Sequence, residues 1–299
     1  MKTDSPNITA RVIADSINTS GNRLTSLVIT LPRIVLAEFN THRALSKNSA
    51  SSRAIPFNKM VEQVLKNPFV PTKFQQDHKG MQGTKYFTGN TEEVIRGEWL
   101  HARDVAVLQA KSLNQMGVTK QICNRLLEPF MLHTIISTAT EWQNFIALRA
   151  HDQAEIHIQD AAYKILEVLN NSIPKLLQPG EWHIPFGDNI DSDKLADAYY
   201  SEQLESPIEA AIKIAIARCA RVSYMNFEGK DDYAADIRLF DMLKASGHMS
   251  PFEHVAQALP ASTQSGNFIG FEQFRKVCEG ENKNDDRLIT YSNVGKTSL

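Results

Sequence analysis

The sequence of 299 residues has few cysteines: Cys123, Cys219 and Cys278 lie far apart. No CxxC pair is present, so the spacing suggests neither a zinc knuckle nor a disulfide framework. Nothing around the three cysteines has the features of an activated thiol. We therefore expect no chemistry that depends on a cysteine nucleophile.

The sequence also lacks an excess of charge and long apolar runs. Its 32 basic and 34 acidic residues give a formal net charge of −2, whereas binding through nucleic-acid phosphates requires a basic face. The 14 Gly and 12 Pro residues exclude collagen-like and disordered classes. The most apolar stretch, residues 24–39, is too short and too interrupted to span a bilayer, and no signal peptide is evident. We expect a soluble cytoplasmic protein that binds neither nucleic acid nor membrane.

Several well-known catalytic motifs are missing. There is no GxGxxG, HExxH or GxSxG, and Gly295-Lys296-Thr297 resembles a P-loop only in part, because Thr290 stands where its first glycine belongs. The chain also ends at Leu299, which leaves no helix to bind a phosphate. His248 and His254 could be metal ligands, but hydrogen-bonded structural histidines are the more frequent case. We therefore expect no metal site.

Proline, glycine and β-branched residues divide the chain into expected elements. Residues 28–30 and 34–36 predict two strands interrupted at Pro32. The polar residues 41–56 predict a loop or short helical turns, and five Pro and Gly residues over 67–91 predict an ordered loop or lid. From residue 255 onward we expect short strands and turns, followed by a polar tail over 277–299.

Helical periodicity covers much of the remaining chain. It predicts an amphipathic helix over 92–116 that ends at Gly117, and another helix over 118–135. Thr138-Ala-Thr-Glu141 matches a capping box and predicts the start of a long helical segment that extends to Pro174. Further helices are expected from Pro207 onward and over about 233–245, the latter ending at Gly247.

Two segments near opposite ends of the chain are similar to each other. Leu27–Arg43 and Val255–Lys276 both contain an apolar run, a proline, a second apolar run, and a Glu…Phe…Arg ending. The pattern is compatible with a duplicated pair of strands and also with chance, and the sequence leaves both open.

Arg, His, Ser and Asn residues are concentrated in three segments. Arginine offers paired donors to oxyanions, and Ser and Asn add single hydrogen bonds, so this composition favours binding of an anion. A solvated loop or helix face is the alternative for each segment taken alone. The segments are His42-Arg43-x-x-Ser46-x-Asn48-x-x-Ser51-x-Arg53, then Glu141 to Glu155, and finally Ala220-Arg221-Val222-Ser223 together with His248 to His254.

Together these segments resemble the flavin-dependent thymidylate synthases. The signature loop of that family is Arg-His-Arg-x-x-Ser-x-Asn-x-x-Ser-x-Arg, which this chain matches from His42 to Arg53. Further matches are Asn144-Phe-x-x-Leu-Arg149, Arg221-Val-Ser223, Gly247-His-x-Ser-Pro-Phe-Glu-His254, and Arg125 four residues ahead of Pro129. The resemblance covers about two thirds of the chain.

The order of the segments differs from that of the family. The Arg-Val-Ser and Pro-Phe-Glu-His segments come first in the family but last here, so the resemblance implies a circular permutation with the cut in an exposed connection. It also implies an α+β fold, with a twisted, largely antiparallel sheet flanked by long helices. Residues 1–299 would form one catalytic domain, with 67–91 as an insertion or lid, and four copies would form a homotetramer with sites between subunits.

The resemblance implies reductive methylation of dUMP at C5 to give dTMP. FAD is the implied cofactor, and methylenetetrahydrofolate and NADPH are the implied co-substrates. In such an enzyme the cofactor performs the difficult chemistry, while the protein positions and polarises the reactants.

The resemblance assigns roles to individual residues. Arg149 would stabilise negative charge at the O2/N3 edge of the pyrimidine, which is worth ~3 kcal/mol for one such donor, and Ser51 would be the second catalytic residue. The nucleotide would contact Glu38, Ser51, Arg53, Arg125 and Arg149, with Arg53 and Arg125 at its phosphate. FAD would contact His42, Arg43, Asn144, Ser223, Ser250 and Glu253, and His248 would lie near the folate and nicotinamide.

The chain departs from the family pattern at three positions. Thr41 replaces the arginine that opens the signature loop, and Arg275 is a candidate to supply that guanidinium from elsewhere. Ser49 replaces an acidic or amide residue, and Glu38 replaces a glutamine. Because a carboxylate near the base favours an amino-bearing edge, hydroxymethylation of dUMP or dCMP remains an alternative. A catalytically degenerate homologue that acts as a binding subunit is the third possibility.

Overall fold

The computed structural model describes residues 7–79, 83–222 and 232–278. The chain contains both helices and strands, and the strands form one large and two small sheets. This mixed architecture is consistent with the expected α+β class. Ser223 and the tail from residue 279 onward lie outside the described residues.

The largest sheet has five strands in the order β3-β4-β2-β1-β5. All neighbours in it are antiparallel except β1 and β5, so the prediction of a largely antiparallel sheet is confirmed. The pairing of β2 with β4 runs without a shift from Thr25 opposite Ala139 to Pro32 opposite Leu132. The strands are β1 (Thr9–Asn18), β2 (Arg23–Pro32), β3 (Ser46–Ser49), β4 (Leu132–Ala139) and β5 (Lys175–Leu177).

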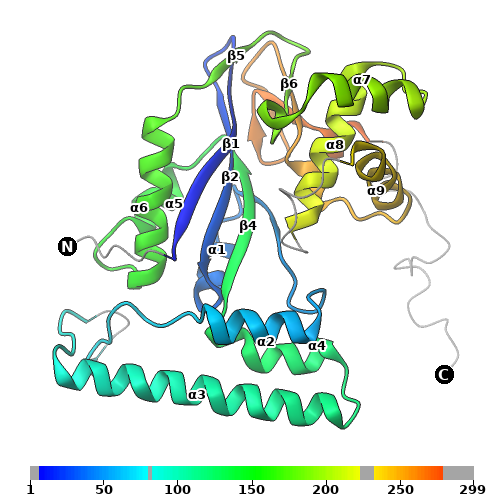
Figure 1. Cartoon of the computed structure of the whole chain (residues 1–299). Coiled ribbons are helices and arrows are strands. Elements are labelled where there is room, and N and C mark those ends of the chain that lie inside the picture. Colours follow the sequence, from blue (N-terminus) through cyan, green and yellow to red (C-terminus); the bar gives the residue numbers. More distant parts are fainter. Residues whose placement is uncertain (1–6, 80–82, 223–231, 279–299) are drawn as a thin grey trace, which may run out of the picture.

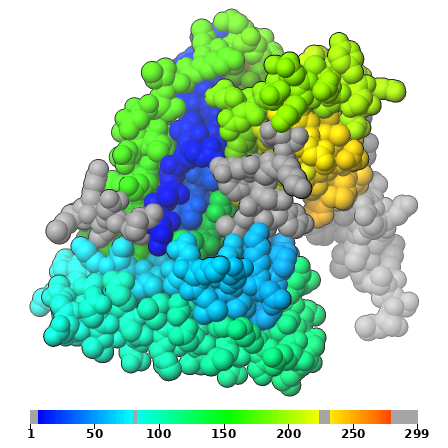
Figure 2. Space-filling view, in the orientation of Figure 1, coloured from blue at the N-terminus to red at the C-terminus, as the bar shows by residue number. Residues whose placement is uncertain are grey.

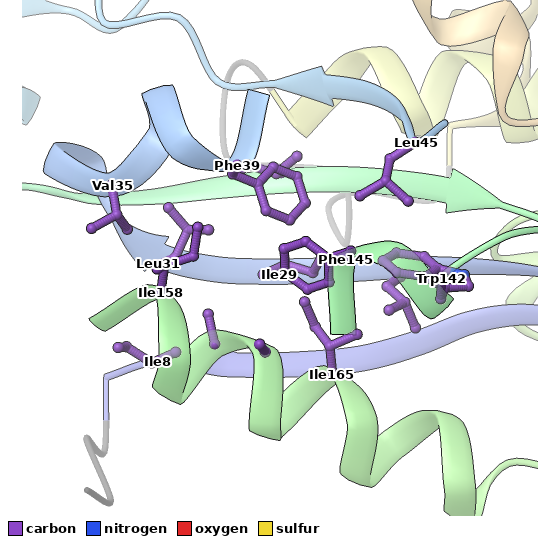
Figure 3. Close-up of a cluster of buried hydrophobic side chains, with 14 of the residues drawn as sticks. Ile8, Ile29, Leu31, Val35, Phe39, Leu45, Trp142, Phe145, Ile158 and Ile165 are labelled. Carbon is purple, nitrogen blue, oxygen red and sulfur yellow. The ribbon is translucent and has the colours of Figure 1, made fainter. Parts of the chain in front are cut away.

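Both faces of the central strand β2 are covered. Leu27 and Ile29 point to one face and Val28 to the other, because successive side chains of a strand alternate. The first face packs against α1 (Leu36–Asn40), α5 (Gln143–Arg149) and α6 (Ile156–Asn171), as Figure 3 shows. The second face packs against the end of α8 (Pro207–Arg221). Each large apolar side chain buried in this way contributes ~1.5–3 kcal/mol.

Two further layers surround the sheet (Figure 1). Beside α8 lie α7 (Ser192–Ser201), α9 (Tyr233–Ala245) and a three-stranded sheet made of β6 (Trp182–His183), β7 (Ala256–Ala258) and β10 (Phe271–Gln273). Across the lower end of the sheet in Figure 1 lie α2 (Phe57–Lys66), α3 (Asn90–Gln115) and α4 (Lys120–Cys123). This lower layer has its own apolar cluster, which includes Met60, Val107 and Leu127.

One edge of the large sheet reaches the surface. β5 pairs with β1 only at residues 16–18 of β1, and Figure 2 shows the earlier part of β1, in dark blue, exposed between the green and yellow-green helices. The remaining short elements are β8 (Gln264–Ser265), β9 (Phe268–Ile269), α10 (Phe274–Val277) and the 3-10 turns Arg33–Val35, Asn124–Phe130, Gly187–Asn189 and Ser250–Glu253.

Several predicted elements are confirmed. α3, α8 and α9 lie close to the ranges that periodicity indicates, and short strands follow residue 255. Gly117 and Gly247 have φ angles of 88° and 73° after α3 and α9, a left-handed conformation that glycine adopts without a Cβ penalty. The described residues of the segment 67–89 are mainly loop, held by a bridge between Gln75 and Tyr86. The role of this segment as a lid stays a prediction.

The predicted strand at residues 34–36 is wrong. Arg33–Val35 form a 3-10 turn, and α1 begins at Leu36. Leu36 and Phe39 are both buried against the sheet, as residues three apart on a helix can be. The loop predicted over 41–56 contains β3, which the polar composition did not indicate.

The helix predicted over 118–135 is wrong in its second half. α4 and the 3-10 turn Asn124–Phe130 are followed by β4, which pairs with β2 on one side and β3 on the other. Thr134, Ile135 and Ile136 are β-branched residues that fit a central strand better than a helix.

The capping box at Thr138–Glu141 is also wrong. Thr138 belongs to β4, and its Oγ1 lies 2.6 Å from Ser26 Oγ and 2.8 Å from His254 Nδ1. The expected long helix is two helices, α5 and α6, separated by residues 150–155. Glu155 caps α6, since its carboxylate accepts hydrogen bonds from the backbone N–H groups of His157 and Ile158.

The similarity between the two ends of the chain does not correspond to a repeated structure. Leu27–Arg43 forms most of a long strand and then a helix, whereas Val255–Lys276 forms four short strands before α10. The strand β2 also lies in the five-stranded sheet, while β7 and β10 belong to the three-stranded one. None of the helices in the described ranges is long and apolar enough to cross a membrane.

Candidate functional site

The polar segment from residue 41 to 56 runs along the edge of the large sheet, with β3 in its middle. The C-terminal half of the chain fixes its position. Asn48 Nδ2 donates to the carbonyl of Cys219 at 2.8 Å, and Asn267 Nδ2 donates to the carbonyl of Ala44 at 2.9 Å. Gln273 Nε2 donates to Ser46 Oγ at 3.0 Å. Residues from distant parts of the sequence therefore hold this segment in one conformation.

The first cluster of predicted site residues consists of His42, Asn144 and Arg149, with Thr41 beside them. Arg149 is the last residue of α5; its Nε donates to His42 Nε2 at 2.9 Å and its Nη2 donates to Thr41 Oγ1 at 3.3 Å. The His42 ring packs edge-on against Phe145, with 5.0 Å between ring centroids. The first and second polar segments of the sequence thus meet directly.

The electrostatics of this cluster favour the neutral form of His42. Burial lowers the pKa of His42, and the positive charges of Arg149 and Lys47 lower it further, while a hydrogen bond with Asn144 opposes the shift. A neutral ring can accept the Arg149 N–H at Nε2, so its proton lies on Nδ1. His42 therefore orients the Arg149 guanidinium without competing for an anion.

The second cluster joins the signature segment to the turn before β7. Ser250 Oγ donates to Asn48 Oδ1 at 3.2 Å, and the carboxylate of Glu253 forms an ion pair with Arg275. Lys47 links the two clusters: its Nζ donates to the carbonyl of His42 at 2.6 Å. Burial lowers the pKa of Lys47 to about 8, with Arg43 contributing and Glu253 opposing. Three predicted site residues here are exposed to solvent: Arg43, His248 and Ser250.

The third cluster lies where the signature segment meets the 3-10 turn Asn124–Phe130. Ser52 Oγ donates to Glu128 Oε1 at 2.5 Å, and Arg125 Nη1 lies 3.7 Å from the same carboxylate oxygen. Asn124 Nδ2 donates to the carbonyls of Ser52 and Ile55 at 2.7 and 2.9 Å. These bonds bring Arg125 to the part of the loop that contains Ser51, which is half-buried, and Arg53, which is exposed.

The structure groups the predicted residues but does not join all of them within one chain. In the described part of the chain, no hydrogen bond or ion pair connects Arg53 or Arg125 to the first two clusters. Glu38 lies on α1 next to the first cluster, since Thr41 Oγ1 donates to its backbone carbonyl at 2.6 Å. Its Oε2 is buried and has no hydrogen-bond partner among the described residues.

A buried histidine chain was missed by the sequence reasoning. Ser16 and Ser26 hydroxyls lie 2.8 and 2.9 Å from the two ring nitrogens of His183, and Ser26 continues through Thr138 to His254 Nδ1. Burial lowers the pKa of His183 and His254 to about 3. Of these residues, only His254 was indicated by the sequence, as the last residue of the Pro-Phe-Glu-His motif. In the structure its ring hydrogen-bonds to Thr138 inside the protein.

The described residues give no support for a cysteine nucleophile or for a metal site. All three cysteines are buried and form no disulfide, and burial raises the pKa of the Cys219 thiol. His248 is exposed while His254 is fully buried, and the described residues contain no group of three His, Cys, Asp or Glu side chains that could hold a metal ion.

The first two clusters have the charge of an anion site. These clusters contain the basic residues Arg43, Lys47, Arg149 and Arg275, and the carboxylate of Glu253 is paired with Arg275. Guanidinium groups bind phosphate through paired donors, and neighbouring amides and hydroxyls add single hydrogen bonds. The donor set therefore suits an anion such as a phosphate group.

Fold and site together define an α+β protein with a cationic site rich in hydroxyl and amide groups. No known family model matches the sequence, and no curated protein matches it either. One similar solved structure is the UMP/dUMP methylase PolB from Streptomyces cacaoi, bound with 5-Br UMP. It has 15% sequence identity and a TM-score of 0.43, and the match covers 55% of this chain and 89% of that one. A likeness of this degree establishes neither the family nor the reaction of this chain.

Proposed function

We propose that this protein is a flavin-dependent enzyme that methylates C5 of dUMP, with methylenetetrahydrofolate as carbon donor and NADPH as reductant. The supporting observation is the convergence of three motifs that are far apart in the sequence. Arg149 of the second segment contacts His42 of the first, and Ser250 of the third contacts Asn48 of the first. If each segment were only a solvated loop or helix face, these contacts between the segments would not be expected.

In this proposal the nucleotide is held at both ends by arginines. Arg53 and Arg125 bind its phosphate, with Ser51 beside them. Arg149 lies against the pyrimidine edge and stabilises the negative charge that develops when C5 acts as a nucleophile. A donor that is already oriented before the reaction costs no reorganisation, and the bond to neutral His42 supplies that orientation.

The same proposal assigns the remaining polar residues to the cofactors. His42, Arg43, Asn144, Ser223, Ser250 and Glu253 hold FAD, and His248 lies near the folate and nicotinamide. When bound, FAD supplies the redox and one-carbon transfer chemistry. Because the phosphate residues and Arg149 lie in separate clusters of one chain, we propose that copies of the chain assemble as a homotetramer and complete the sites between them.

A second candidate function is hydroxymethylation of a cytosine nucleotide, and Glu38 favours it. Its buried Oε2 lacks a partner among the described residues, and a buried carboxylate oxygen without a donor is costly. The amino group of cytosine is a donor, whereas O4 of uracil is an acceptor.

Mass spectrometry of the product separates these functions. The protein is incubated with methylenetetrahydrofolate, NADPH and either dUMP or dCMP. A methyl group added to dUMP supports the proposal, and a hydroxymethyl group on dUMP or dCMP supports the alternative. If neither nucleotide is modified and the protein cannot be reconstituted with FAD, it is a binding subunit without this activity.

A further inference from the structure

A cavity of about 420 Å³ lies between α5, α6 and the end of the large sheet. Its walls are largely apolar and include Trp142, Ile146, Ala147, Leu166 and Leu169. This volume is within the usual range for sites that bind small molecules. None of its described lining residues belongs to the three clusters of the candidate site, so the cavity is a separate feature of the molecule.

Three side chains at the cavity, Trp142, Arg23 and Thr140, can offer hydrogen-bond donors to a ligand. The indole Nε1 of Trp142 is buried and has no hydrogen-bond partner among the described residues. Figure 3 shows this nitrogen on the side of the ring that faces away from the apolar cluster. Trp142 as a whole is only 7% exposed, and indole N–H groups in buried positions are normally bonded.

Arg23 and Thr140 add to this set of donors. Arg23 uses Nε and Nη2 to bind Asp15 at 2.9 and 2.6 Å, and Nη2 also donates to backbone carbonyls. Among the described residues, Nη1 has no hydrogen-bond partner. Thr140 Oγ1 accepts the backbone N–H of Ile269 at 3.1 Å, which leaves its hydroxyl hydrogen available. Both residues line the cavity.

We propose that this cavity binds a small carboxylate with an apolar body. A carboxylate is the acceptor that an indole N–H, a guanidinium edge and a hydroxyl can share. The apolar body would cover Ile146 and Leu166, which are half-buried. Asp15 offsets the charge of Arg23, so a ligand needs both an acceptor and an apolar part to bind well.

The inference does not depend on the proposed function, although the two meet on one helix. α5 contributes Gln143, Ile146 and Ala147 to the cavity, and Asn144 and Arg149 to the first cluster. A ligand in the cavity therefore packs against the helix that positions Arg149.

The indole signals in a ¹H–¹⁵N spectrum of the full chain test the proposal directly. Decanoate is the probe, and decylamine is the control with the same chain length and the opposite charge. We expect decanoate to shift the Trp142 indole N–H downfield, and Trp99 to stay in place because its N–H already donates to the carbonyl of Phe69 at 2.9 Å. An unmoved Trp142 signal, or an equal shift with decylamine, overturns the proposal.

Two variants measure the affinity by calorimetry. Trp142→Phe keeps the ring but removes the donor, and should weaken decanoate binding about tenfold, as expected for loss of a hydrogen bond to a charged group. Ala147→Trp fills the exposed side of the cavity and should abolish binding, whereas Leu148→Trp, on an exposed neighbour of the same helix, should not. Binding that is unchanged in Ala147→Trp, or lost equally in Leu148→Trp, contradicts the assignment.

Discussion

Arg149 and His42 set each other's properties through one hydrogen bond. Arg149→Gln removes the guanidinium, and with it a positive charge that lowers the pKa of His42. We therefore predict that the pKa of His42 rises in this variant, as followed by NMR titration of its ring signals. If the proposed role of Arg149 is right, turnover also falls about a hundredfold, since one oriented donor is lost.

A conservative variant of Arg149 shows whether its positive charge alone lowers the pKa of His42. Arg149→Lys keeps the positive charge, so the pKa of His42 should stay closer to its original value than in Arg149→Gln. An unchanged His42 titration in the glutamine variant would show that the bond between the two side chains does not govern the ring.

The buried histidines make the stability of the fold depend on pH. Burial lowers the pKa of His133, His183 and His254 to about 3, while an unfolded histidine titrates near ~6.5. Between these values the unfolded state binds protons that the folded state does not, so the free energy of unfolding falls as the pH drops below ~6.5. Each histidine contributes a loss of up to ~1.4 kcal/mol per pH unit in this window.

Urea denaturation at pH 6.5 and pH 5.0 measures this effect. The variant His183→Gln keeps a donor and an acceptor beside Ser16 and Ser26 but has no titrating group. Its loss of stability between the two pH values should be smaller than that of the original chain by ~1.6 kcal/mol, because an unfolded histidine is already half-protonated at pH 6.5. Equal losses in both proteins would mean that His183 is charged or accessible in the folded state.

At the scale of elements, the start of α6 depends on Glu155. Its carboxylate accepts two backbone N–H groups and bonds to the His157 ring, and these hydrogen bonds together lower its pKa against the opposing effect of burial. Glu155→Ala should lower the free energy of unfolding by ~1 kcal/mol, the usual cost of losing an N-cap. Glu155→Asp, which can still cap the helix, should recover part of it in the same urea measurement.

The sequence predicted correctly those helices that begin or end at a proline or glycine. α3, α8 and α9 are bounded by Gly117, Pro207 and Gly247, and each was placed within a few residues. β4 was missed because the spacing of its apolar residues is compatible with both a helix and a strand. Its pairing with β2 and β3, which the sequence does not show, determines that it is a strand. For the same reason Thr138 matched a capping box, although its hydroxyl belongs to the hydrogen bonds between strands and His254.

The candidate site was predictable as a set of residues but not as an arrangement. The motif spacing identified His42, Asn144 and Arg149, which the structure places together. It could not identify Lys47 as the link to the second cluster, nor the pairing of Arg275 with Glu253, because both depend on tertiary contacts between distant segments. Ser223 lies outside the described residues, so its role remains a prediction.

At the scale of the whole molecule, the separation of the third cluster from the first is the reason to expect that several chains assemble. Arg53 and Arg125 lie on the third cluster and Arg149 on the first. If four chains complete their sites with residues from neighbouring copies, light scattering after gel filtration should give about four times the 33.5 kDa mass of one chain. A monomer with full methylating activity would contradict the shared sites.

The most direct test of the central claim is the absorbance spectrum of the purified protein after reconstitution with FAD. We predict that flavin absorbance stays with the protein through gel filtration. We also predict that NADPH bleaches it under anaerobic conditions, both in the presence and in the absence of dUMP. A protein that retains no flavin, or whose bound flavin NADPH never reduces, would contradict a flavin-dependent reaction at the clusters around His42, Arg149 and Lys47.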